Sequence, residues 1–201
     1  MFIVFEGIDG TGKSTQAKLF SESLNKKNIS HTLTREPGGC PSAEHIRHLV
    51  LDHEFLPTTE LLLMIAARNE HWHNTIHPAL QRGDWVVCDR YIDSTRAHQG
   101  FEAGIDLGII NQLHKLLHIP TKPDHVFVLM LDIDTALTRA RSRKQQDRYD
   151  HFGRPYYEKI YDGFQALAQT EKYYHLIDAN RSPLEIHQEI LSIAGQSNEQ
   201  I

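Results

Sequence analysis

Eight consecutive residues near the start of the chain have the types and spacing of a phosphate-binding loop: Gly7-Ile8-Asp9-Gly10-Thr11-Gly12-Lys13-Ser14. They fit the pattern G-x-x-x-x-G-K-[ST], in which glycines let backbone N–H groups turn toward phosphate oxygens. In this pattern the lysine, Lys13, supplies a cation to the β- and γ-phosphates, and the Ser14 hydroxyl is a Mg²⁺ ligand. The motif predicts a nucleotide-binding protein.

The flanking sequence supports this interpretation. The apolar run Phe2-Ile3-Val4-Phe5 precedes the motif, and a helix-like stretch, residues 15–24, follows it. A phosphate loop works only between a strand and a helix, whose positive dipole end then faces the phosphates. The alternative, a glycine-rich turn without a ligand, does not require both neighbours.

The elements that must position this loop alternate along the chain. Short strands rich in Val, Ile, Leu and aromatic residues are predicted at Phe2–Glu6, His31–Arg35, Trp85–Asp89, Val126–Asp132 and Tyr174–Asp178. Helices are predicted at Thr15–Asn25, Ser42–Leu51, Thr58–Leu80, Leu107–Leu117, Thr135–Arg143, Arg154–Gln169 and Pro183–Ile193. This order predicts one α/β domain, residues 1–201, with a five-stranded parallel sheet covered by helices on both faces.

Charged residues gather where these strands end. Arg35-Glu36-Pro37-Gly38-Gly39 follows the second strand, and Asp89-Arg90-Tyr91 ends the third. Because ligands bind at the carboxyl ends of parallel strands, we expect these groups to meet the phosphate loop. Asp89 is predicted to join Ser14 as a Mg²⁺ ligand. Carboxylates and arginines around phosphates are typical of phosphoryl transfer, which needs positioning and charge neutralisation.

An arginine-rich stretch follows the fourth strand and is predicted to form a mobile lid at about residues 139–153. It contains Arg139, Arg141, Arg143, Lys144 and Arg148. The phosphate loop itself has no arginine, so charge in the transition state must be met from elsewhere. We expect Arg143 or Arg148 to stabilise this charge. The alternative is that the arginine-rich stretch is only a solvated helix face.

Composition narrows the range of partners. The net charge of the 201 residues is −5, which disfavours binding of polymeric nucleic acid. No apolar run is long enough to cross a membrane, and the N-terminus passes directly into the first strand. The two cysteines, Cys40 and Cys88, fit a reducing compartment. These features predict a cytoplasmic enzyme without a membrane partner.

Five motifs, in this order, resemble those of the bacterial thymidylate kinase family. They are F-E-G-I-D-G-T-G-K-S-T, T-R-E-P-G-G, A-A-R at residues 66–68, D-R-Y at 89–91 and S-T-x-A-x-Q-G at 94–100. The resemblance spans nearly the whole chain. It implies phosphorylation of dTMP to dTDP with Mg-ATP, the fold of P-loop nucleoside monophosphate kinases, and a homodimer.

The resemblance also implies site residues. Asp9 takes the place of the carboxylate that approaches the acceptor sugar and phosphate. Arg35, Arg47 and Arg90 take the places of groups around the dTMP phosphate and the transferring phosphoryl group. Arg68 corresponds to the arginine at the thymine edge, and the polar side chains that read the base correspond to Thr95 and Gln99. The expected catalytic set is Asp9, Lys13, Arg90, Arg143 and Arg148.

Three positions depart from the family pattern and leave alternatives open. Met64 stands where an aromatic residue often stacks on thymine, His98 where tyrosine is usual, and Ala103 where arginine is common. A kinase for another nucleoside monophosphate or for a deoxynucleoside therefore stays an alternative, as does a nucleotide-binding switch without transfer. A metal site at His71, His73 and His77 is a further, weaker alternative.

Overall fold

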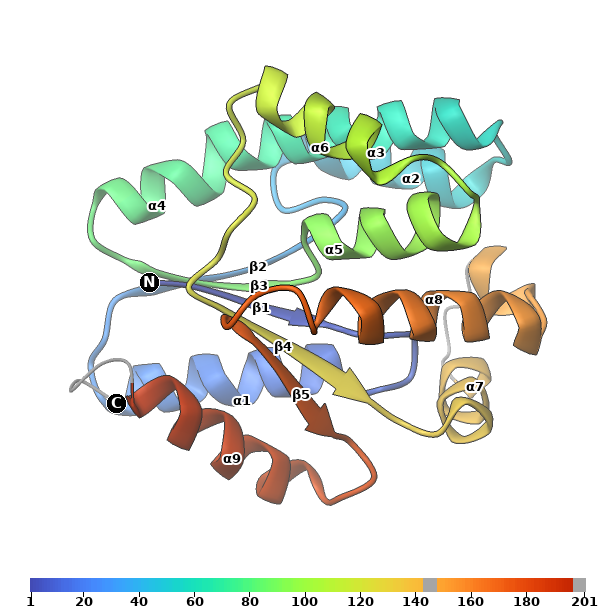
Figure 1. Cartoon of the computed structure of the whole chain (residues 1–201). Helices are drawn as coiled ribbons and strands as arrows, with labels where there is room; N and C mark the ends of the chain where they lie inside the picture. The colour runs from blue at the N-terminus through green and yellow to red at the C-terminus, as the bar shows by residue number, and fades with distance from the viewer. Residues whose placement is uncertain (143–147, 197–201) are drawn as a thin grey trace.

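The strands form one parallel sheet in the order β2-β3-β1-β4-β5 in this computed structural model, which describes residues 1–142 and 148–196. The strands are β1 (Phe2–Glu6), β2 (His31–Arg35), β3 (Trp85–Asp89), β4 (His125–Met130) and β5 (Tyr174–Asp178). In Figure 1 they fan out with their carboxyl ends toward one side of the molecule. The predicted fold class, a five-stranded parallel sheet between helices, is confirmed.

Burial differs between the inner and the edge strands. All five residues of β1 are buried, as are most residues of β3 and β4. The edge strands β2 and β5 contain exposed and partly exposed residues. Parallel strands covered on both faces need continuous apolar runs, and edge strands do not. The core lies on both faces of β1, where the ring centroids of Phe5 and Phe127 are 5.6 Å apart and those of Phe5 and Phe20 6.2 Å.

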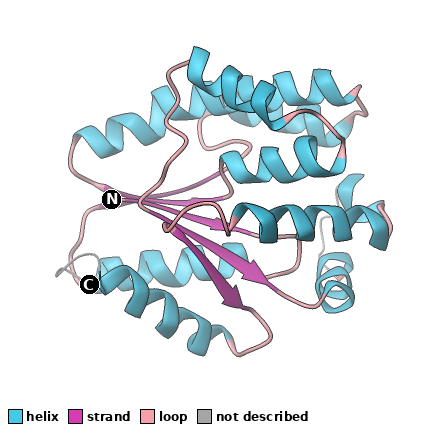
Figure 2. Ribbon diagram, viewed as in Figure 1, coloured by secondary structure: helices cyan, strands magenta, loops and turns pink. Residues whose placement is uncertain are grey.

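Helices cover the two faces of the sheet. Helices α1 (Lys13–Lys26) and α9 (Pro183–Gln196) pack together on one face (Figure 1). The other face carries α2 (Pro41–Asp52), α3 (Pro57–His71), α4 (His77–Gln81), α5 (Ile92–Thr95), α6 (Leu107–Leu116) and α8 (Arg154–Leu167), while α7 (Ile133–Arg141) follows the carboxyl end of β4. Figure 2 shows the strands as a layer between these helices.

Two predicted elements differ from the structure. The predicted helix 58–80 is one helical path, α3 to α4, that contains a π-helical segment at Trp72–Ile76. The predicted strand 126–132 ends at Met130, because the Asp132 carboxylate accepts the Thr135 N–H at 2.9 Å and caps α7.

The helical segment after β3 was not predicted. It consists of α5 and a π-helical segment at Arg96–Glu102. Its inner side carries polar residues that line the cavity described below, among them Ser94, Thr95 and Gln99. The apolar periodicity that marks an amphipathic helix is therefore missing at this site.

The sheet order places a crevice at the carboxyl ends of β1 and β3. The chain leaves β1 through α1 on one face of the sheet, and it leaves β3 through α5 on the other (Figure 1). Two neighbouring strands whose connections leave in opposite directions create a binding crevice. Among the described residues, no helix is long and apolar enough to cross a membrane.

Candidate active site

The phosphate loop turns between β1 and α1, as the sequence predicts. Gly7, Gly10 and Gly12 all have positive φ, from 82° to 135°. At Gly10 a Cβ atom would clash with the backbone of Ala136 in α7, so only glycine fits there. Gly12 precedes the first turn of α1 without a side-chain cap, so the N–H groups of that turn remain for a ligand.

Lys13 lies folded over this loop. Its Nζ atom donates to the Ile8 carbonyl at 2.8 Å and lies 3.9 Å from the Asp9 carboxylate. Burial, together with the nearby Arg90 charge, lowers the pKa of Lys13 to about 8. A cation so desolvated interacts strongly with an anion that enters the loop.

Ser14 and Asp89 meet at the loop's edge. The Ser14 hydroxyl donates to Asp89 Oδ2. The other oxygen, Asp89 Oδ1, is buried and has no hydrogen-bond partner in the described part of the chain. A hydroxyl and a carboxylate beside a phosphate site are oxygen ligands of the kind that Mg²⁺ takes from a protein, with phosphates and water supplying the rest. The residues present therefore fit this ion.

The histidines at 71, 73 and 77 do not form a metal site. The described residues contain no group of three His, Cys, Asp or Glu side chains placed to hold a metal. Instead, His71 is buried, with Nδ1 3.0 Å from Glu36 and Nε2 2.7 Å from the Thr34 hydroxyl.

Arg90, which follows β3, contacts the phosphate loop directly. Its Nη1 donates to the Gly7 carbonyl at 3.1 Å and to the Ser94 hydroxyl at 3.0 Å, and its Nη2 donates to Asp9 Oδ1 at 2.7 Å. Burial alone would lower the pKa of Arg90, but the Asp9 and Glu6 carboxylates raise it, so the guanidinium stays charged. The sequence motifs predicted this meeting of Asp9, Lys13 and Arg90.

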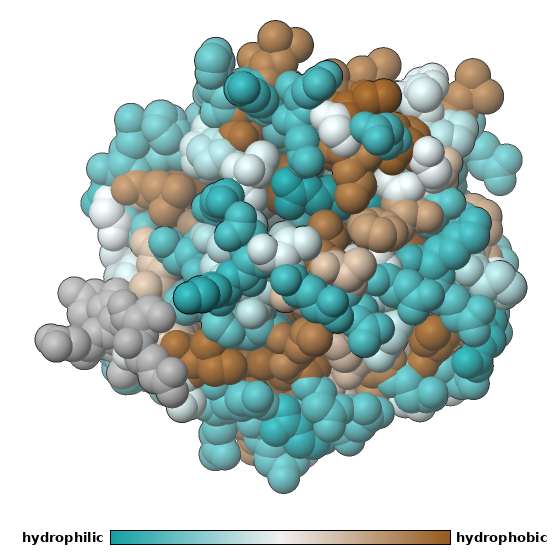
Figure 3. Space-filling model, viewed as in Figure 1, coloured by the Kyte–Doolittle hydropathy of each residue, from teal (hydrophilic) through white to brown (hydrophobic). Residues whose placement is uncertain are grey.

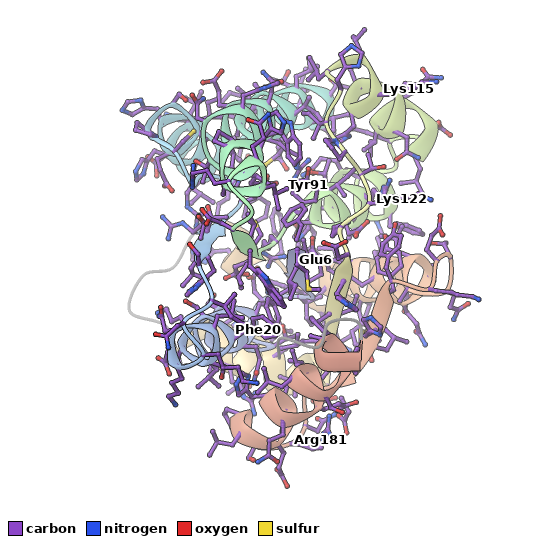
Figure 4. All side chains as sticks on the ribbon, turned by 90° about the vertical axis from the view of Figure 1, so that its left-hand side faces the viewer. Glu6, Phe20, Tyr91, Lys115, Lys122 and Arg181 are labelled. Atoms are coloured by element: carbon purple, nitrogen blue, oxygen red, sulfur yellow. The ribbon has the colours of Figure 1, made fainter. Side chains whose placement is uncertain are left out.

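Glu6, the last residue of β1, supports this arrangement from below. Its carboxylate accepts the Tyr91 N–H at 2.7 Å, the Ser94 N–H at 3.1 Å and the Ser94 hydroxyl at 2.6 Å. In Figure 4, Glu6 and Tyr91 lie in the interior, whereas Lys115, Lys122 and Arg181 point outward. Burial and the Asp93 charge raise the pKa of Glu6 to about 7. Sequence reasoning missed Glu6, although it stands next to the glycine motif.

Arg68 is the centre of a buried network at the other end of the site. It donates to Glu36 at 2.6 Å, to the Thr95 hydroxyl at 2.9 Å and to the Tyr91 carbonyl at 3.0 Å. A further bond joins Nη1 to His114 Nε2 at 2.9 Å. Burial lowers the pKa of His114 to about 3, so the imidazole is neutral and accepts from Arg68, while its Nδ1 bonds the Ile110 carbonyl.

These groups share one cavity of about 510 Å³. It runs from the phosphate loop, through Asp89 and Arg90, to Met64 and Arg68, and its wall also includes Arg35, Arg47, Thr95, His98, Gln99, Arg139 and Tyr149. Arg35 pairs with Glu44 at 3.1 Å, and Arg47 donates to the Pro37 carbonyl at 2.9 Å. Every predicted substrate-binding residue thus lines this cavity; the role of each stays a prediction.

The arginines of the predicted lid differ from one another in their relation to the cavity. Arg143 lies outside the described residues, which resume at Arg148. The Arg148 guanidinium pairs with Glu60 and stacks over the Tyr149 ring, and it is not part of the cavity wall. Arg139, in α7, does line the cavity. The catalytic role expected of Arg143 or Arg148 stays a prediction.

His98 occupies the wall between the two ends. Its Nδ1 lies 2.9 Å from the Tyr156 hydroxyl. Burial and the Arg90 charge lower the pKa of His98 to about 3, so the ring is neutral. It can exchange hydrogen bonds with a ligand but cannot supply a charge.

Comparisons with known proteins agree with these motifs. The family model for thymidylate kinase matches residues 5–190. The chain is 43% identical over 186 residues to a thymidylate kinase of Ruegeria pomeroyi, covering 90% of this chain and 88% of that one. It is 41% identical over 189 residues to a thymidylate kinase of Rickettsia africae, covering 93% of both. The crystal structure of thymidylate kinase from Ehrlichia chaffeensis matches with a TM-score of 0.79 and 35% identity, over 96% of this chain and 98% of that one.

Proposed function

The chain belongs to the thymidylate kinase family, and we propose that it transfers the γ-phosphoryl group of ATP to dTMP, giving dTDP and ADP. One observation carries the assignment of roles. The phosphate loop, with Arg90 bound to its Asp9, lines one cavity, which continues to the buried Arg68. One cavity can therefore hold a donor phosphate, an acceptor phosphate and a base.

The donor end is formed by residues 7–14. Backbone N–H groups of the loop and of the first turn of α1 bind the phosphates, and Lys13 leaves the Ile8 carbonyl to contact the β- and γ-phosphates. Ser14 and Asp89 would hold Mg²⁺, which neutralises charge on the β- and γ-phosphates when bound.

The acceptor end is formed by arginines around Asp9. Both N–H groups of Arg90 Nη1 donate within the protein, to Gly7 and Ser94, and one N–H of Nη2 donates to Asp9. Its Nε–H and the second N–H of Nη2 have no partner among the described residues and are free to bind the dTMP phosphate in a bidentate manner. Arg35 and Arg47 lie on the same wall and add positive charge.

The chemical step needs no covalent intermediate. The dTMP phosphate oxygen attacks the γ-phosphorus, the bond to the β–γ bridging oxygen breaks, and ADP leaves with that oxygen. Lys13 and Arg90 stabilise the charge that develops on the equatorial oxygens. Arg90 is held in place by Asp9 before the substrates arrive, whereas Lys13 turns from the Ile8 carbonyl to the phosphates.

An ADP-release assay with four acceptors tests this function. We expect dTMP to have the highest kcat/KM, with dUMP lower because it lacks the methyl group that Met64 would contact. Thymidine has no phosphate for Arg90 and should not be phosphorylated. Preference for dGMP or thymidine would favour a kinase for another nucleotide or for a deoxynucleoside, and no transfer to any acceptor would favour a nucleotide-binding switch.

We also propose that two copies associate through α3 and α6. These helices pack on each other through Leu61, Ile65 and Ile110, yet both leave apolar side chains exposed. Leu62, Ile109 and Leu116 are 56%, 50% and 72% exposed, and the upper part of Figure 3 shows apolar side chains over these helices. An apolar face of this kind suits a self-complementary contact between identical chains.

We propose the cytoplasm as the site of action. Cys40 and Cys88 are both buried and both free thiols. Unpaired cysteines are typical of a reducing compartment.

A further inference from the structure

Glu60, in the first turn of α3, receives three hydrogen bonds beside the base end of the cavity. Its Oε1 accepts from Gln99 Nε2 at 2.7 Å and from the Tyr149 hydroxyl at 3.0 Å. Its Oε2 accepts from the Arg148 guanidinium. Gln99 and Tyr149 line the cavity, but Glu60 does not. Glu60 therefore acts on the cavity through its partners.

All three partners of Glu60 are donors. Arg148 carries only N–H groups, and it also donates to the Tyr149 hydroxyl at 2.8 Å. The hydroxyl's own hydrogen is thereby directed to Glu60. Burial and the Glu60 charge raise the pKa of Tyr149, which keeps that hydrogen in place. A carboxylate, which can only accept, satisfies all three of these donors.

This arrangement fixes which way the Gln99 amide points. An amide has a donating NH₂ end and an accepting oxygen end, and a carboxylate can bind only the NH₂ end. Turning the amide over would set its oxygen against Glu60 Oε1, with the loss of a charge-assisted hydrogen bond. Gln99 is 3% exposed, and its Oε1 makes no hydrogen bond within the described residues. That oxygen remains available to accept from a ligand in the cavity.

The hydrogen bonds of Arg68 within the protein likewise limit how Arg68 can bind a ligand. Its Nε–H, both hydrogens of Nη1 and one of Nη2 are bound to Glu36, Thr95, His114 and Tyr91. One N–H is left. Beside the Thr95 hydroxyl, the base end thus offers one donor from Arg68 and one acceptor from Gln99. Thymine has a carbonyl at ring position 4 and an N–H at position 3, whereas cytosine has an amino group and an acceptor there.

We propose that Glu60 is a positioning residue that sets the polarity of the Gln99 amide, so that the site selects pyrimidines with an N–H at position 3 and rejects cytosine. The inference rests on the proposed function, because it places the base of a pyrimidine monophosphate at this end of the cavity. Glu60 does not touch the base; its effect passes through Gln99.

The test compares acceptor selectivity in the full chain. The measured quantity is kcat/KM for dTMP divided by kcat/KM for dCMP, at saturating ATP, for the wild type, Glu60→Gln, Gln99→Leu and the double variant. The glutamine at 60 can donate to Gln99 Oε1, so the amide is free to turn over. We expect Glu60→Gln to lower the ratio about 10-fold, the scale of one hydrogen bond between neutral groups. The KM for ATP should not change.

The double variant separates positioning from general support. If Glu60 acts through Gln99, adding Glu60→Gln to Gln99→Leu lowers the ratio no further. Effects that multiply would show that Glu60 acts by another route and would overturn the proposal, as would a wild-type ratio in Glu60→Gln. Glu54→Gln is the matched control, because Glu54 is exposed and is not part of the cavity wall; its ratio should stay at the wild-type value.

A second variant keeps the test decisive if Glu60→Gln does not fold. Gln99→Asn keeps both polar ends of the amide but is one methylene too short to reach Glu60, so it too should lower the ratio about 10-fold. An unchanged ratio in Gln99→Asn would overturn the proposal. A wild-type enzyme that does not phosphorylate dTMP would instead overturn the proposed function.

Discussion

Replacing Arg90 by lysine tests the acceptor site most directly. The change keeps the positive charge but removes the planar fork. In the structure this fork spans the Gly7 carbonyl, the Ser94 hydroxyl and the Asp9 carboxylate, with donor–acceptor distances from 2.7 to 3.1 Å. A single ammonium nitrogen cannot reach all three and also bind a phosphate. Arg90 also has a φ of 72°, in the left-handed region. Lysine would have to adopt the same backbone conformation, so the substitution does not relieve it.

The size of the effect follows from the contacts that are lost. Arg90 has two N–H groups left for the acceptor phosphate within the described structure, and a lysine held by Asp9 would offer one poorly directed donor. A hydrogen bond to a charged group contributes about 1.5–3 kcal/mol. Losing one such bond, together with the alignment of the attacking oxygen, lowers kcat/KM for dTMP by about 10² to 10³.

The assay must separate the two substrates. Steady-state ADP release gives kcat/KM for dTMP, and titration calorimetry gives the dissociation constant of ATP. We expect the first to fall and the second to stay within about twofold. Arg90 contacts the phosphate loop through the Gly7 carbonyl and the Asp9 carboxylate, and neither is among the backbone N–H groups and the Lys13 ammonium that we expect to bind the ATP phosphates. Weaker ATP binding with normal use of dTMP would reverse the assigned roles and refute the reasoning.

Four further predictions concern other parts of the protein. Lys13→Ala should lower kcat at least about 10²-fold with the fold retained, because the cation that we expect to contact the β- and γ-phosphates is lost; near-normal turnover of the folded variant contradicts this. Arg139→Ala should lower kcat more than Arg148→Ala does, because only Arg139 lines the cavity; steady-state kinetics of both variants decides. The pKa of Glu6 is raised from 4.5 to about 7, so the folded state holds an extra proton in that range and stability falls as pH rises from 4.5 to 7. Urea unfolding of wild type and Glu6→Gln should therefore diverge by up to about 3 kcal/mol across this window. Leu116→Glu should convert a dimer to a monomer in analytical ultracentrifugation, and a monomeric wild type would refute the dimer.

Local sequence was enough to predict most of the sheet. The buried strands β1 and β3 are apolar runs in the sequence, and the glycine motif predicts the loop between β1 and α1. Since carboxyl ends of parallel strands share one edge, the meeting of Asp9 and Arg90 could also be inferred. These predictions depend only on neighbouring residues and on sheet geometry.

The missed features depend on contacts between distant segments. His114 and Glu36 bind Arg68 from 46 and 32 positions away, and no periodicity connects them. Glu60 and Arg148 are 88 positions apart. The helical segment after β3 was missed because its cavity side is polar, so that burial and hydrophobicity do not coincide there. Such pairings follow from the packed structure and not from residue type.

The buried position of Arg68 has a consequence for inhibitors of this enzyme. Arg68, which we propose contacts the base, also ties α3, α6 and the segment after β3 together, and it neutralises Glu36, which is 3% exposed. A substitution that weakened an inhibitor at this point would leave a carboxylate buried without its ion pair, a loss of about 3–5 kcal/mol. Folded domains have only about 5–15 kcal/mol of stability in total. A substitution of Arg68 that confers resistance to an inhibitor would thus also destabilise the folded protein. The remaining Arg68 N–H is therefore a suitable hydrogen-bond donor for a designed ligand to contact.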